Sequence, residues 1–296
     1  MLTPAADIAV DATLVQTLLR LQHPDLARLE LRTVGTGWDN AMFRLGSSLA
    51  VRVPRRASAA ALLVKEQRWL PTLAAQLPIP VPQPVRLGIP STAFPWHWSV
   101  LSWIEGDPAD QRPIAPTEAG RLAEFLRALH RPAPDDAPSS EVRGVPLERR
   151  AAVVEQRLSR LMGILPALDD AVLRIWHEAL AAPAADTRVW VHGDLHAQNV
   201  LVRNGAIAGI IDWGDITAGD PATDLAGVWM LLGDTAARNE ALSRYAASAD
   251  EIVRAKGWAV LFASLLLEHG LIDNPRHVTM ALSTLRRLSE SRKSPK

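Results

Sequence analysis

Two short polar turns, each next to strand-like apolar runs, constrain the fold of this chain more than any other feature. The first turn ends the segment Val191-His192-Gly193-Asp194-Leu195-His196-Ala197-Gln198-Asn199, and the second lies in Ile210-Ile211-Asp212-Trp213-Gly214. Between them, Asn204-Gly205 separates two apolar runs, which is a typical hairpin sequence. The pattern therefore predicts one turn followed by a hairpin, with polar groups at the strand ends.

These two turns carry two carboxylates and one carboxamide. Such a set suits phosphoryl transfer, in which one Asp accepts the proton of an attacking hydroxyl while an Asn and a second Asp hold the metal ions on the nucleotide phosphates. Asp194 is the predicted base. Asn199 and Asp212 are the predicted Mg²⁺ ligands, because magnesium prefers hard oxygen donors.

Each of these residues also has a simpler interpretation. A lone Asp194 is more often a turn residue or a helix cap than a catalytic base. The triplet His192-x-Asp194-x-His196 is compatible with a hydrolytic zinc site, because residues two apart on an extended path point to the same side. No helix-borne His pair and no nearby Glu base accompany it, and the zinc site stays an alternative.

Taken together, three motifs resemble the aminoglycoside phosphotransferase family. They are His-Gly-Asp-Leu-His-x-x-Asn at 192–199, Ile-Asp-Trp at 211–213 and Gly-Asp-Pro-Ala-Thr-Asp-Leu-Ala at 219–226. Protein kinases carry His-Arg-Asp-x-x-x-x-Asn and Asp-Phe-Gly at the corresponding turns. The resemblance covers nearly the whole chain. It implies transfer of the γ-phosphoryl group of ATP or GTP to a hydroxyl of a small molecule, such as an aminoglycoside or another antibiotic, and does not separate antibiotic resistance from metabolism.

The fold that this resemblance implies is α+β and bilobal, like that of protein kinases. Residues 1–104 would form a small N-lobe with an antiparallel sheet and the helix of Glu66, and residues 105–296 a larger, mainly helical C-lobe. The apolar patterns of the first part predict two helices, at 11–21 and 57–76, and strands at 26–34, 38–45, 49–53, 85–87 and 95–103. The second part predicts helices at 117–130, 147–161, 166–180, 221–232, 236–245, 249–269 and 275–288, a mobile loop at 131–143 and a disordered tail from Arg292.

Further residues are assigned to the nucleotide by the resemblance. Arg52 stands where kinases carry a strand Lys that touches the phosphates, and Glu66 is its expected helix partner. Arg and Lys are not interchangeable, so a plain surface ion pair is the alternative. The backbone of Ser102 and Ile104 would meet the adenine edge. His196 stands where protein kinases often carry a Lys, and either touches the transferring phosphate or makes neutral hydrogen bonds.

Residues around the two turns are expected to support them. His192 would brace the loop, Asp224 would hold it by hydrogen bonds, and Asp220 would cap a helix.

Trp213 and Trp229 are candidates for stacking on an acceptor, with core packing favoured for Trp229. Acidic side chains that could receive a cationic acceptor are Glu268, Asp273, Asp234 and Glu240.

Composition limits the other functional classes. The chain has no cysteine and a formal net charge of +0, so neither disulfides nor thiolate metal sites are available, and nothing favours nucleic acid or an anionic membrane as a partner. The apolar run Trp258–Leu267 is too short to span a bilayer. We therefore expect a cytoplasmic protein whose partners are a nucleoside triphosphate and a small hydroxylated molecule. A non-catalytic, nucleotide-binding regulator is the alternative, motivated by Arg52.

Overall fold

The computed structural model describes residues 5–165 and 170–290. The described residues form two compact units: one holds residues 5–76 together with Pro80–Glu105, and the other holds Leu77–Ile79 and the described residues from Gly106 onward. A sheet dominates the first unit and helices the second, so the predicted α+β class is confirmed. The junction expected between residues 104 and 105 stays a prediction.

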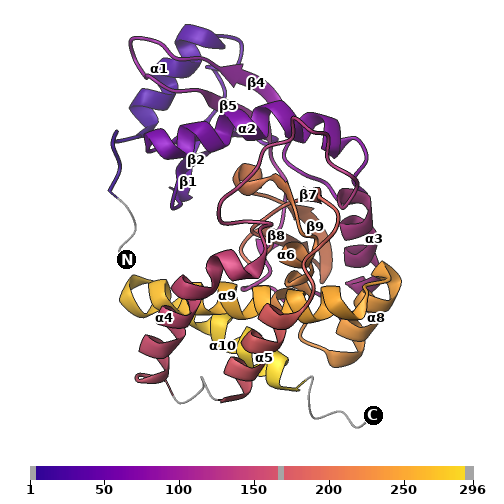
Figure 1. Ribbon diagram of the computed structural model, residues 1–296. Coiled ribbons are helices and arrows are strands. Elements are labelled where there is room, and N and C mark those ends of the chain that lie inside the picture. Colours follow the sequence, from indigo (N-terminus) through magenta and orange to yellow (C-terminus); the bar gives the residue numbers. More distant parts are fainter. Residues whose placement is uncertain (1–4, 166–169, 291–296) are drawn as a thin grey trace. The chain divides into compact units, whose positions relative to one another are not determined.

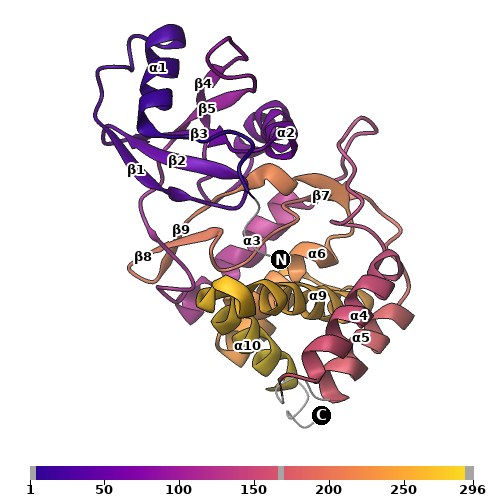
Figure 2. The ribbon, with the colours of Figure 1, turned by 90° about the vertical axis from the view of Figure 1, so that its left-hand side faces the viewer.

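The N-terminal unit is built on a five-stranded antiparallel sheet with the order β1-β2-β3-β5-β4 (Figure 2). A tight turn joins β2 to β3, in which Leu45 pairs with Leu49 and Gly46 adopts a left-handed φ of 59°. Glycine tolerates this conformation at no steric cost. The elements of this unit are α1 (Ala12–Gln22), β1 (Leu31–Thr36), β2 (Asn40–Leu45), β3 (Leu49–Pro54), α2 (Ala57–Ala74), β4 (Pro84–Gly88) and β5 (Trp98–Ser102).

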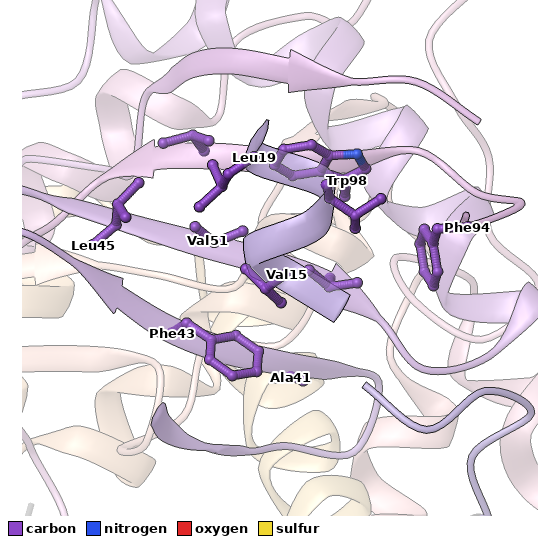
Figure 3. Packing of buried hydrophobic residues seen from close by; sticks show 11 residues of the cluster. Val15, Leu19, Ala41, Phe43, Leu45, Val51, Phe94 and Trp98 are labelled. Carbon is purple, nitrogen blue, oxygen red and sulfur yellow. The ribbon is translucent and has the colours of Figure 1, made fainter. Parts of the chain in front are cut away.

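One face of this sheet is closed by an apolar core. Phe43 of β2 and Val51 and Val53 of β3 alternate onto this face, and α1 packs Val15 and Leu18 against it (Figure 3). Each of these side chains is at most 2% exposed. Burying an aliphatic or aromatic side chain of this size stabilises a fold by roughly 1.5–3 kcal/mol. This face is therefore structural.

The opposite face of the sheet carries the polar side chains. Arg52 and Ser99, which are paired in the β3–β5 register, alternate away from the apolar core. Helix α2 supplies their partners: Glu66 forms an ion pair with Arg52, and Gln67 donates a hydrogen bond to the Ser99 hydroxyl at 2.7 Å. The period-two alternation of β3 therefore places Arg52 beside the helix that the sequence assigned to it.

The C-terminal unit is organised around α9 (Ala249–Asp273), which packs against α4, α5, α6 and α10 (Figure 1). Gly257 permits one close contact, because a Cβ atom there would lie 2.3 Å from the Cβ of Ala179. The other helices of this unit are α3 (Ala119–Leu129), α4 (Ala151–Met162), α5 (Asp170–Ala181), α6 (Ala222–Leu225), α7 (Gly227–Leu231), α8 (Thr235–Tyr245) and α10 (Pro275–Glu290), with short 3₁₀ turns at Pro116–Glu118, Leu147–Arg150 and Trp213–Asp215.

Helix α9 begins at the predicted residue 249 and ends at Asp273 rather than at residue 269. By length and composition alone it is the one helix, among the described residues, that could cross a bilayer, yet 67% of its apolar window is buried inside the protein. Core helices of proteins without membrane segments share these properties. Its length is therefore weak evidence for a membrane span.

Short strands frame the two polar turns. Strands β8 and β9 form a hairpin whose turn residues Asn204 and Gly205 have φ values of 54° and 81°. Two consecutive positive φ values define a type I′ turn, as the Asn-Gly sequence predicted. The strands of this unit are β6 (Asp107–Pro108), β7 (Val189–Val191), β8 (Val200–Arg203), β9 (Ala206–Ile210) and β10 (Thr217–Gly219), and β7 pairs with β10.

Some element boundaries differ from the prediction. Strand β1 begins at Leu31 rather than residue 26, because Ala27 and Leu29 close backbone turns that follow α1. The single helix expected at 221–232 is interrupted at Ala226, whose N–H is shared between the carbonyls of Ala222 and Asp224. Bifurcated bonds of this kind are common where a helix ends.

The segment 131–143, expected to be a mobile loop, makes backbone hydrogen bonds to two strands. The N–H of Trp190 in β7 donates to Arg131, and the N–H of Ala218 in β10 donates to Pro138. Composition alone does not reveal such bonds, because they depend on distant residues. The expected start of the helix at 166–169 and the expected disorder of the tail from residue 292 lie outside the described residues.

Candidate active site

The β8–β9 hairpin brings the two polar turns together. Val200 pairs with Ile210, and the N–H of Ile211 donates to the main-chain oxygen of Asn199 at 2.9 Å. Asn199 therefore lies at the same end of the hairpin as Asp212. Strand β7 ends at Val191, three residues before Asp194. Ladder register, which sequence patterns specify only indirectly, thus brings the predicted base and the predicted metal ligands into one site.

Three side chains surround the carboxylate of Asp194. Its Oδ1 accepts from Nη2 of Arg143 at 3.0 Å, and its Oδ2 accepts from Nδ2 of Asn199 and lies near Nε2 of His196, both at 3.2 Å. The Asp194 side chain is 22% exposed. The carboxylate is therefore fixed in orientation and still reachable.

Neighbouring charges determine the ionisation of this carboxylate. Burial alone would raise the pKa of Asp194, but His196 and Arg143 outweigh it and hold the pKa far below its usual range. Burial would likewise lower the pKa of His196, yet the Asp194 carboxylate raises it above its ordinary value. Asp194 is consequently an anion near neutral pH, and its carboxylate favours the protonated form of the imidazole beside it.

A buried carboxylate from another element holds the turn that carries Asp194. The oxygens of Asp224 accept the N–H groups of His192 at 2.6 Å and Gly193 at 2.8 Å. Gly193 has a φ of 85°, and a Cβ there would lie 2.7 Å from the main-chain oxygen of Asp215. The predicted structural role of Asp224 is therefore confirmed, and only glycine fits at position 193.

Asp220 also has the expected structural role. It accepts the N–H of Ala222 at 2.9 Å at the start of α6 and pairs with the buried Arg254 at 2.7 Å. Trp213 and Trp229 are 0% and 2% exposed. Their proposed stacking on an acceptor is therefore wrong for both rings, because core packing covers them.

His192 uses both of its ring nitrogens within the protein. Its Nε2 lies 3.0 Å from the carbonyl of Ile211, and its Nδ1 accepts the N–H of Asp194 at 3.2 Å. A nitrogen that accepts a hydrogen bond has no lone pair left for zinc. Among the described residues, no three His, Asp or Glu side chains are arranged to hold a metal ion. His192 therefore braces the loop, and the zinc alternative lacks its ligands.

Asn199 and Asp212 fit a magnesium ion better than zinc. The Asn199 amide nitrogen also donates to the main-chain oxygen of Asp194 at 2.9 Å, which leaves its carbonyl oxygen as the end available to a cation. Asp212 is an exposed non-glycine residue in the left-handed region, with φ 62° and ψ 70°. Such backbone strain is concentrated at functional sites. Two hard oxygen donors suit Mg²⁺, which keeps several waters and takes further ligands from phosphates.

Of the residues assigned to the nucleotide, His196 lies in the C-terminal unit and the others lie in the N-terminal unit. Nη1 of Arg52 and Oε2 of Glu66 are 2.5 Å apart, and the two side chains are 7% and 2% exposed. The expected pair therefore forms, and it is buried rather than a surface ion pair. Ser102 ends β5, where its N–H donates to Gln83, while the next N–H donates to Ser48. Neither bond uses the Ser102 carbonyl or the Ile104 N–H that were predicted to meet adenine.

One residue of this site was not predicted. Arg143 contacts Asp194 and also places Nε and Nη2 at 3.4 Å from Oδ2 of Asp215. Its guanidinium carbon lies 5.0 Å from the ring centre of Phe262 in α9. Burial would lower the pKa of Arg143, but the two carboxylates raise it. A lone Arg in a segment rich in Pro, Asp and Ser carries no periodic signal, so sequence patterns could not identify it.

Comparisons with known proteins agree with this geometry. A model of the phosphotransferase enzyme family matches residues 30–261. The fold is similar to the GDP and kanamycin complex of APH(2")-IIia, with 19% identity, a TM-score of 0.69 and coverage of 94% of this chain and 98% of that one. It is also similar to macrolide 2'-phosphotransferase MphH from Brachybacterium faecium, with 22% identity, a TM-score of 0.58 and coverage of 97% and 99%. Comparison with curated proteins finds no match.

The family match spans most of the chain, and the similar structures share its fold. The chain belongs to the phosphotransferase enzyme family. It is accordingly a phosphotransferase, as the sequence resemblance implied.

Proposed function

We propose that this protein transfers the γ-phosphoryl group of ATP or GTP to a hydroxyl of a small molecule, with Asp194 as the base and Asn199 and Asp212 as ligands of Mg²⁺. One observation carries the proposal: Asn199 is hydrogen-bonded to Asp194 through its side chain and to Ile211 through its backbone. One end of the β8–β9 hairpin therefore holds the predicted base, Asp194, together with both predicted magnesium ligands, Asn199 and Asp212.

The chemistry assigned to Asp194 is orientation of the acceptor and removal of its proton. The hydroxyl oxygen attacks the γ-phosphorus, the bond to the bridging oxygen breaks with its electron pair on the nucleoside diphosphate, and the hydroxyl proton passes to the carboxylate. Phosphoryl transfer has a loose transition state, so a weakly basic but well-oriented carboxylate is sufficient. The low pKa of Asp194 keeps it ionised and ready to accept that proton.

Magnesium would neutralise charge on the nucleotide phosphates. Asp212 and the carbonyl oxygen of Asn199 would hold it, and their number leaves most coordination positions to water and phosphate oxygens. In the N-terminal unit, Arg52 would neutralise phosphate charge while Glu66 fixes its guanidinium. The backbone of Ser102 and Ile104 would bind the base of the nucleotide. His196 would hydrogen-bond the transferring phosphate or Asp194.

The setting of this reaction also belongs to the proposal. We place it in the cytoplasm, where nucleoside triphosphates are plentiful, with no nucleic acid or membrane as partner. Similar structures include complexes with kanamycin, streptomycin and gentamicin. An antibiotic acceptor, and with it a role in resistance, is one version of this proposal. The charges next to Asp194 influence which acceptors can bind.

Substitution of the base tests the proposal. Purified protein is incubated with γ-labelled ATP or GTP, Mg²⁺ and a panel of hydroxylated metabolites and antibiotics, and the labelled product is quantified. We expect Asp194→Asn to lower kcat by roughly 10²- to 10⁴-fold, the usual contribution of a general base, with nucleotide affinity little changed. Asp186→Asn, which removes an exposed carboxylate before β7, is the matched control. A fully active Asp194→Asn variant disproves the base assignment, and tight nucleotide binding without transfer to any acceptor favours the regulator.

A further inference from the structure

Three arginines follow one another in the segment that leads from the loop before α4 into that helix, and the first of them lies next to Asp194. Arg143 contacts the base itself. Arg150 precedes the first residue of α4, and Arg157 lies two helical turns further on. Residues seven apart lie on the same face of a helix, so Arg150, at the N-cap of α4, and Arg157 within it lie on the same face.

This side of α4 faces α9. Val154, between the two arginines, is fully buried, and α4 packs against α9. Arg157 donates to Oε2 of Glu268 at 2.8 Å and lies 3.4 Å from the Ser264 hydroxyl, both on α9. Arg143 lies over Phe262 of the same helix. The three arginines therefore line one region between α9 and the catalytic turn.

The three guanidinium groups differ in their partners. Arg143 has Asp194 and Asp215, and Arg157 shares Glu268 with Arg160. Arg150 has a half-buried side chain whose Nε is buried without a hydrogen-bond partner among the described residues. Burial and the charges of Arg143 and Arg157 lower the pKa of Arg150. Because Nε is enclosed by the protein, an anion would reach this guanidinium through the solvent-exposed part of the half-buried side chain.

Acidic groups that could attract a cationic acceptor are already used. Glu268 is held by two arginines, Asp234 caps α8 through the N–H of Ala237, and Glu240 pairs with Arg244. Glu268, Asp234 and Glu240, three of the four acidic side chains expected from the sequence to bind amino groups, therefore have partners within the protein. Arg143 places a positive charge next to the predicted base, together with the carboxylate of Asp215.

We propose that the phosphate acceptor carries an anionic group, a carboxylate or a phosphate ester, which binds the guanidinium of Arg150 with Arg143 beside it while the acceptor hydroxyl faces Asp194. The inference rests on the proposed function and specifies its substrate. A guanidinium presents a planar pair of donors that matches either anion bidentately. Cationic aminoglycosides would instead be repelled by the guanidinium of Arg150, whereas Arg143 and Arg157 are each paired with carboxylates.

A binding experiment tests the anion site without any acceptor. Inorganic phosphate, followed by its ³¹P line, and acetate, followed by ¹H saturation transfer, are titrated separately into the wild type at constant ionic strength. We expect saturable binding of at least one anion, an affinity at least tenfold weaker in Arg150→Gln, and partial recovery in Arg150→Lys. Arg149→Gln, which removes the same charge from the exposed adjacent residue, should bind like the wild type. Equal binding by wild type and Arg150→Gln, or no saturable binding, would overturn the proposal.

Turnover then identifies the acceptor class. Hydroxy acids, sugar phosphates, neutral sugars and aminoglycosides are compared with labelled nucleotide and Mg²⁺. The site predicts transfer to an anionic acceptor, with KM raised at least tenfold in Arg150→Gln and kcat within threefold. Efficient transfer to an aminoglycoside, unchanged in Arg150→Gln, contradicts it. If no compound reacts, the anion titration decides. The proposed phosphotransferase function has its own disproof, which is independent of the anion site: the wild type would not bind Mg-nucleotide.

Discussion

Asn199 and Asp194 are joined twice by one amide group: Nδ2 of Asn199 lies 2.9 Å from the main-chain oxygen of Asp194 and 3.2 Å from its Oδ2. This relationship links the base to a predicted metal ligand. It also closes the turn between β7 and β8, so that the orientation of one group depends on the other.

Replacement of Asn199 should therefore affect the base as well as the metal. We expect Asn199→Ala to lower kcat at least a hundredfold, equivalent to about 2.7 kcal/mol in the transition state, because both the donor to Asp194 and a Mg²⁺ ligand are lost. Nucleotide affinity measured in EDTA should change less than threefold. Gln198→Ala, at the adjacent residue, is the control, and an equal loss of activity there would show that the loop tolerates no substitution.

Asp224 should be essential for stability and not only for activity. Asp224→Ala leaves the buried N–H groups of His192 and Gly193 without their carboxylate acceptor. Each hydrogen bond to a charged group contributes about 1.5–3 kcal/mol, so a loss of about 3 kcal/mol or more is expected. In a chain of this size that lowers the melting temperature by roughly 6 °C or more. Asp186→Ala should melt within about 1 °C of the wild type, and equal melting of the two variants would refute the assignment.

The sequence predicted the elements of this site better than it predicted their contacts. Asp194, Asn199 and Asp212 were identified because each stands in a turn with distinctive neighbours, and Asn204-Gly205 determined the hairpin between them. Arg143 escaped detection because its partners are 51 and 72 residues away in the chain. Local periodicity contains no information on such a pair.

The same limit applies to the fold. The position of Arg52 opposite the apolar face follows from the alternation along β3, because a strand has a fixed period of two. The interruption near Ala226 and the backbone bonds of segment 131–143 depend on tertiary hydrogen bonds. Burial of Trp213 likewise follows from its packing on Phe125 and His192, which no pattern in the chain indicates.

Two substitutions of Arg52 distinguish its contribution to stability from its contribution to phosphate binding. Arg52→Ala leaves Glu66 buried without its Arg52 partner, and breaking such a pair costs about 3–5 kcal/mol. Arg52→Lys keeps the charge and restores the residue that kinases carry, so its melting temperature should lie closer to the wild type. If Arg52 also binds phosphate, Arg52→Lys retains nucleotide affinity within about tenfold. Stable Arg52→Lys protein without nucleotide affinity would indicate that Arg52 acts through guanidinium geometry.

Glu268 offers a gain-of-binding prediction for the arginine region. Glu268→Gln removes the carboxylate that Arg157 and Arg160 share. The positive potential next to Arg150 should rise, and the affinity for inorganic phosphate should increase severalfold at low ionic strength. Glu178→Gln, on the exposed side of α5, is a control of equal charge. Weaker phosphate binding by Glu268→Gln would show that Glu268 mainly positions the arginines.

Thermal stabilisation by nucleotide and metal tests the central claim most directly. Melting temperatures of the wild type and Asp212→Asn are measured with ATP or GTP, each with Mg²⁺ or EDTA. Two protein oxygens cannot form a complete magnesium site, so Mg²⁺ alone should have little effect, while Mg-ATP or Mg-GTP should stabilise by roughly 2.7 kcal/mol at a hundredfold excess over Kd. Asp212→Asn should lose most of the metal-dependent increment. Equal stabilisation by nucleotide with and without Mg²⁺, unchanged in Asp212→Asn, would contradict the assignment of this site.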